Sequence, residues 1–110
     1  MTRKVRISPA ADRDIDGHIA LIVREQPEAA IRFIDALATT FDHIVHMPGM
    51  GNTRNYRNPR LAGLRMIPVS GFRNFLVFYH AASHTIDVVR VLHAARNVGK
   101  IFAGQDVPSR

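Results

Sequence analysis

No cysteine occurs among the 110 residues, so the chain can form neither a disulfide nor a thiolate metal site. No apolar run approaches the roughly 20 residues that span a membrane. The N-terminal residues, MTRKVRISPAADRD, also lack the apolar middle segment of a secretory signal. These absences predict a cytoplasmic protein that does not cross a membrane.

Carboxylates are missing from the middle of the chain, where no Asp or Glu occurs between His43 and Ile86. The net charge is −1 over residues 1–42 and +7 over residues 43–110, which gives +6 in total. A charge distribution this uneven attracts polyanions, so we expect an acidic macromolecular partner: nucleic acid, an acidic protein, or a protein that handles nucleic acid. A basic surface that only keeps the protein soluble is the alternative. The cations of the acid-free stretch are Arg54, Arg57, Arg60, Arg65 and Arg73.

Apolar residues make up 46% of the chain, which is ample for one folded core. We therefore expect a single domain over residues 1–110, with its core at about 4–102 and a polar tail at 103–110.

The first half of the chain predicts one strand and two helices. Residues 4–7 alternate polar and apolar side chains, as a short half-buried strand does. Ser8 can cap a helix, Pro9 fits its first turn, and apolar residues then recur every three or four positions as far as Val23. Pro27 begins a second amphipathic helix, so the two helices should pack antiparallel as a hairpin.

The second half predicts a loop and three strands. The stretch 51–63 contains glycine, asparagine and proline without a period, and indicates a long exposed loop. The pattern then predicts three strands, over residues 64–69, 72–80 and 85–93. It also predicts a short helical turn over 94–102. The predicted fold is α+β in the order β-α-α-β-β-β, with the helical hairpin packed on a mostly antiparallel twisted sheet.

Neither candidate cluster of metal ligands is convincing. Asp12, Asp14 and Asp16 lie in the early turns of the first helix, where they favour the positive end of its dipole. His43 and His46 are three residues apart, but no third ligand is evident near them. We expect no metal and no cofactor.

Five short motifs, in this order and spacing, resemble the ParE branch of the RelE/ParE toxins of type II toxin–antitoxin systems. The resemblance covers roughly residues 4–102 and implies the same β-α-α-β-β-β fold. It also implies an acidic, ParD-like antitoxin that neutralises the toxin by forming a hetero-oligomer with it. The motifs are Val5-x-Ile7-Ser8-Pro9-x-Ala11, Pro27-x-Ala29-Ala30-x-x-Phe33, Pro48-Gly49-Met50-Gly51, Leu64-Arg65-x-x-Pro68-Val69, and Phe78-Tyr79 followed by Val89-Arg90-Val91-Leu92-His93-Ala94-Ala95-Arg96.

The resemblance leaves two mechanisms open. ParE-like members inhibit DNA gyrase by binding it, whereas RelE-like members cleave messenger RNA on the ribosome. Cleavage would need phosphate-binding cations and a proton shuttle, for which Arg65, Arg90 and His93 are the candidates. The lysines and the aromatic acid/base group of the RelE pattern are missing from the loop before Leu64 and from the tail, which favours gyrase inhibition.

Binding an enzyme requires only a complementary surface with arginine anchors. A free-standing nucleic-acid-binding domain is the third hypothesis. Each residue also has a structural interpretation, in which Arg65 and Arg90 pair across strands or with Asp87, and His93 completes a strand end. The candidate target-binding residues are Arg54, Arg57, Arg60, Arg65, Arg90, His93 and Arg96.

Overall fold

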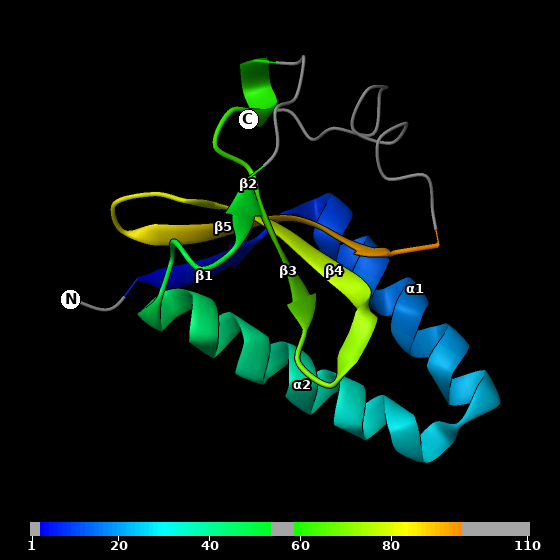
Figure 1. The fold of residues 1–110 in the computed structure, drawn as a ribbon. Helices are drawn as coiled ribbons and strands as arrows, with labels where there is room; N and C mark the ends of the chain where they lie inside the picture. The colour runs from blue at the N-terminus through cyan, green and yellow to red at the C-terminus, as the bar shows by residue number, and fades with distance from the viewer. Residues whose placement is uncertain (1–2, 54–58, 96–110) are drawn as a thin grey trace.

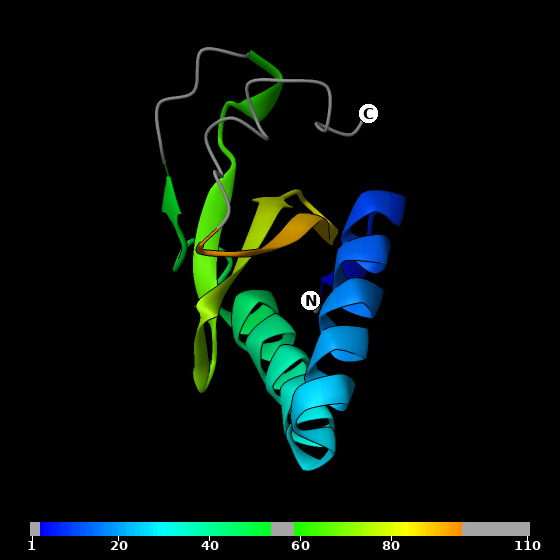
Figure 2. The same ribbon diagram turned by 90° about the vertical axis from the view of Figure 1, so that its right-hand side faces the viewer.

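A computed structural model describes residues 3–53 and 59–95 of the chain. Within those residues, two helices pack on one face of a five-stranded sheet (Figures 1 and 2), which confirms the α+β prediction and its element order. The helices are α1 (Pro9–Glu25) and α2 (Pro27–His46). The strands are β1 (Lys4–Ile7), β2 (Asn52–Thr53), β3 (Arg65–Val69), β4 (Phe72–Ala81) and β5 (Thr85–His93).

The strand order is β1-β5-β4-β3-β2, so the first and last strands of the chain are neighbours in the sheet. β1 runs parallel to β5, and the other pairs are antiparallel. A bulge interrupts the β4–β5 pairing, because Phe78 lies opposite Arg90 and Tyr79 opposite Val88. Val89 is the extra residue of β5, and such an insertion locally bends and twists a strand.

The helices begin as the sequence predicts. The Ser8 hydroxyl accepts a hydrogen bond from the Ala11 amide at 3.0 Å, and Pro9 occupies the first turn of α1. Only Gln26 separates the two helices, so α2 returns antiparallel to α1 (Figure 2). None of the described helices is long and apolar enough to cross a membrane.

Each face of the sheet carries its own apolar cluster. Side chains alternate along β4, so Val77 and Tyr79 face the helices while Phe78 faces the other way. The helix-side core buries Phe33, Ile44, Val88 and their neighbours almost completely. The opposite face holds a smaller cluster made of Leu61, Leu64, Phe78 and Leu92.

In the stretch 51–63, the described residues on either side of 54–58 form two short elements that its composition does not indicate. Asn52 and Thr53 pair with Met66 and Arg65 as strand β2, and Pro59–Leu61 form a short 3-10 helix, η1. Leu61 is buried in the cluster on the helix-free face. The sequence did not predict either element, because a strand of two residues is too short to show a hydrophobic period and a single buried leucine does not produce one.

Candidate functional site

The structure describes three of the seven predicted target-binding residues in full: Arg65, Arg90 and His93. Arg54, Arg57 and Arg96 lie outside the described residues. Arg60 lies in η1, but its side chain is also outside them.

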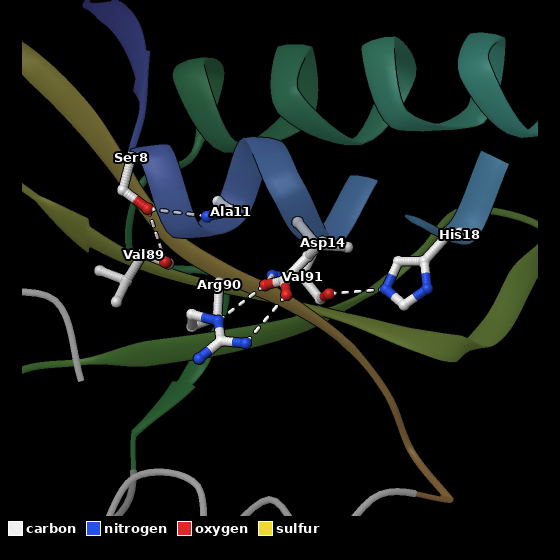
Figure 3. Close-up of polar contacts among 7 residues, drawn as sticks. All are labelled: Ser8, Ala11, Asp14, His18, Val89, Arg90 and Val91. Atoms are coloured by element: carbon white, nitrogen blue, oxygen red, sulfur yellow. Dashed lines mark hydrogen bonds and ion pairs between the residues drawn. The ribbon is translucent and has the colours of Figure 1, made fainter. Parts of the chain in front are cut away.

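Arg90 is bound to a carboxylate of α1. Its Nε donates to Asp14 Oδ2 at 2.7 Å and its Nη2 to Asp14 Oδ1 at 2.9 Å, a two-pronged ion pair (Figure 3). Asp14 Oδ2 also accepts the backbone N–H of Val91 at 3.1 Å. Arg90 is only 9% exposed, so the pair is shielded from water and from salt.

The ion pair belongs to a row of side chains from α1 and its N-cap Ser8 that close the edge of β5 (Figure 3). β1 covers that edge only as far as Val88, because it ends at Ile7. Beyond Val88, Ser8 Oγ donates to the Val89 carbonyl at 2.8 Å, and His18 Nε2 donates to the Val91 carbonyl at 2.7 Å. Side chains of a helix therefore take over the hydrogen bonds that another strand would make.

The partner of Arg90 differs from the predicted one. The sequence suggested Asp87, but Asp87 instead forms an ion pair with Arg6 at 3.4 Å, in which the Arg6 side chain is 74% exposed and the Asp87 side chain 38%. Asp14 was interpreted as a helix-dipole residue, and its contact with Arg90 was missed. A signal was available, because Asp14 and His18 are four residues apart and flank the buried apolar stripe that includes Ala11 and Ile15.

Arg65 holds the turn that follows α2. Its Nη1 donates to the carbonyls of Gly49 and Gly51, at 3.1 Å and 2.8 Å. Directly opposite Arg65 on β4, the Tyr79 hydroxyl donates to the Pro48 carbonyl at 2.9 Å and accepts the Gly51 N–H at 3.0 Å. Burial raises the pKa of Tyr79, while the Gly51 hydrogen bond and the charge of Arg65 act in the opposite direction.

His93 ends β5 on the helix side of the sheet. Its ring meets Phe75 edge-on at 4.9 Å between centroids, and His18 meets the same phenylalanine at the same distance. His93 Nδ1 accepts the Ala95 N–H at 3.0 Å, so a neutral ring carries its proton on Nε2. This contact fits the interpretation of His93 as a residue that completes a strand end.

The three described candidates do not form one cluster. Arg65 lies opposite Tyr79 and Arg90 opposite Phe78, and consecutive residues of β4 point to opposite faces. The side chains of the two arginines therefore leave the sheet on different faces, and each is bonded within the chain. Among the described residues, no group of three His, Asp or Glu side chains could hold a metal ion.

Comparison with protein families gave a match over residues 5–98 to the model of the ParE toxin of the type II toxin–antitoxin system parDE. Among solved structures, the fold is similar to a chain of the chromosomal ParDE toxin–antitoxin system from P. aeruginosa. The TM-score is 0.65 at 16% identity, over 83% of this chain and 95% of that one, so the likeness is one of fold. A comparison with curated protein sequences gave no match.

Proposed function

The chain belongs to the ParE toxin family of type II toxin–antitoxin systems, and from this premise we propose that it inhibits DNA gyrase by binding it directly. A cognate acidic, ParD-like antitoxin neutralises it by binding in a hetero-oligomer, and both act in the cytoplasm. Its action in this proposal is recognition by a surface rather than bond breaking.

The ion pair between Arg90 and Asp14 favours this mechanism over RNA cleavage. In a RelE-like nuclease, an arginine at this position would stabilise the charge that develops on a phosphate. Here two guanidinium nitrogens already bind a carboxylate. A phosphate brought to Arg90 would either displace Asp14 or lie next to its negative charge, and both are unfavourable.

Arginines outside that ion pair are the better anchors for a partner. In the proposal the target contacts come from Arg54, Arg57, Arg60 and Arg96, together with His93. Arginine is enriched at the centres of protein interfaces because its planar fork binds carboxylates in two places and stacks on aromatic rings. Asp87 is the one carboxylate among the described residues after His43, and it forms its ion pair with Arg6.

The antitoxin has a suitable surface on the helical hairpin. Four large apolar side chains of α1 and α2 are between 46% and 67% exposed in the described structure. A tail that is disordered when free can fold onto such a surface and bury it. An acidic tail would also screen the basic half of the chain. The exposed residues are Leu21, Val23, Ile31 and Ile34.

The deciding experiment adds the purified protein to two assays, DNA supercoiling by gyrase and translation in a reconstituted system. Inhibited supercoiling with intact messenger RNA supports the proposal. Messenger RNA cut only when ribosomes are present contradicts it and favours the nuclease. Steeply salt-dependent binding to bare DNA or RNA, with both assays unaffected, would point to a free-standing nucleic-acid-binding domain.

A further inference from the structure

The turn at Pro48–Gly51 is bonded to the sheet far more closely than a connecting loop requires. Four of its backbone groups, three carbonyls and one N–H, bind the side chains of Arg65 and Tyr79. Backbone groups of a surface loop usually face water instead. Two neighbouring strands thus use a cross-strand pair of side chains to fix one short turn.

The fit at Gly51 leaves no space for a side chain. A Cβ atom there would lie 2.7 Å from Tyr79 Oη and 3.1 Å from Arg65 Cβ. The Tyr79 ring cannot move away easily, because it is fully buried in the helix-side core. Glycine is therefore required by close approach, and the turn has one position relative to the sheet.

This anchor lies at the entrance to the most basic stretch of the sequence. β2 follows the turn directly and pairs with β3, and Thr53 is its last residue before Arg54. On the far side of that stretch, Leu61 and Leu64 are buried in the opposite apolar cluster. The described residues on both sides of 54–58 are thus held firmly to the sheet.

We propose that Arg65 and Tyr79 are positioning residues for the contact between the toxin and its target. They fix Pro48–Gly51 and β2, and Arg65 contributes through this turn rather than by touching the target. The inference rests on the proposed function, since β2 leads directly to Arg54 and Arg57, which that proposal gives as target contacts. Without the anchor, the turn must become ordered when the target binds, and that loss of freedom lowers affinity.

The test compares Tyr79→Phe, Arg65→Ala and their combination with the unchanged chain. Tyr79→Phe removes two hydrogen bonds from the turn without altering charge or ring packing. We expect each single variant to raise the half-inhibitory concentration against gyrase about tenfold, with little further loss in the double variant, because both act through one turn. Hydrogen exchange of the Gly51 amide should accelerate in all three, while amides of α2 stay protected.

Thr40→Val is the matched control for a general loss of stability. Thr40 is buried in α2, where its hydroxyl donates to the Ala36 carbonyl and accepts the Ser70 N–H, away from the turn. The substitution Thr40→Val removes two hydrogen bonds, as Tyr79→Phe does. The control should inhibit gyrase like the unchanged chain under conditions where it is folded.

Several results would overturn the positioning role. Full inhibition by Tyr79→Phe alongside a weakened Arg65→Ala would mean that Arg65 touches the target itself. The positioning role would also be contradicted if the increase in half-inhibitory concentration of the double variant equalled the product of the two single increases. An increase of the same size in Thr40→Val would contradict it as well. Growth arrest on expression at matched protein levels is measured in parallel, because it reports toxicity whatever the target is.

The two proposals fail in different ways. A chain that arrests growth but leaves gyrase active disproves gyrase as the target, and the positioning role is then decided by the same comparison of growth arrest among the variants. A chain that does neither disproves both.

Discussion

Replacing Asp14 with alanine removes three hydrogen bonds at once, two from the Arg90 side chain and one from the Val91 N–H. The Asp14 and Arg90 side chains are 13% and 11% exposed, so water can hardly replace the lost carboxylate. Breaking a buried ion pair by deleting one partner costs about 3–5 kcal/mol, since the other charge stays buried. Leaving the Val91 N–H without an acceptor adds about 1–3 kcal/mol.

The sum is at least about 4 kcal/mol, a large part of the roughly 5–15 kcal/mol by which domains are stable. Urea unfolding followed by circular dichroism measures it. With a slope of about 1–3 kcal/mol per molar urea, the midpoint should fall by more than about 1 M. Replacing both partners, as in Asp14→Leu with Arg90→Met, should recover most of the loss, because no charge is then left unpaired.

Arg6→Ala is the matched control, since the Arg6–Asp87 pair also involves a residue of β5 but joins it to β1, and the Arg6 side chain is exposed. The Arg6 side chain is 74% exposed and its ion pair measures 3.4 Å, so its loss should change stability by only about 0–1 kcal/mol. If Asp14→Ala destabilises the protein no more than Arg6→Ala does, the Arg90 ion pair is not the structural element described above. Exchanging Asp14 for a phosphate would then cost little, and a phosphate site at Arg90 would no longer be disfavoured.

Three further predictions concern charge. Burial raises the pKa of Tyr79 above its usual 10.0, so the unfolded chain loses that proton at a lower pH than the folded chain does. The free energy of unfolding should therefore fall as the pH rises above about 10. Urea unfolding at several pH values measures this fall, and Tyr79→Phe should flatten it. Replacing Arg54 and Arg57 with alanine should weaken gyrase inhibition about tenfold or more. The same change at two exposed helical residues, Arg24 and Arg32, should have little effect. Equal losses in the two double variants would mean that only net charge matters. Association with an acidic antitoxin, followed by stopped flow, should slow as salt is added, and a salt-independent rate would contradict electrostatic steering.

The element order could be predicted because local signals agree with the packing. The cap at Ser8, the prolines that start both helices and the period-two pattern of the strands each describe the segment that carries them. Pro68 has no N–H for a ladder hydrogen bond, and accordingly it lies on β3 beyond the two residues that β2 covers.

The contacts of the site could not be predicted in the same way, because they join residues far apart in the sequence. The pairing of Arg90 with Asp14 spans 76 positions and lies next to a bulge at Val89 that no local pattern reveals. The carbonyls that Arg65 binds belong to glycines, whose backbone groups carry no sequence signal. That Arg65 and Arg90 lie on strands could be predicted from the sequence, but their bonding partners depend on tertiary structure.

The closure of the β5 edge by α1 also bears on when the toxin folds during synthesis. The hydrogen bonds that Ser8, Asp14 and His18 make to β5 reach residues 73 to 81 positions later in the chain. β1 likewise has its only described strand partner in β5. β1 and α1 therefore cannot form their contacts with the sheet until β5 has left the ribosome. Such long-range contacts slow folding, so the edge of β5 is closed only after every strand of the described sheet has been synthesised.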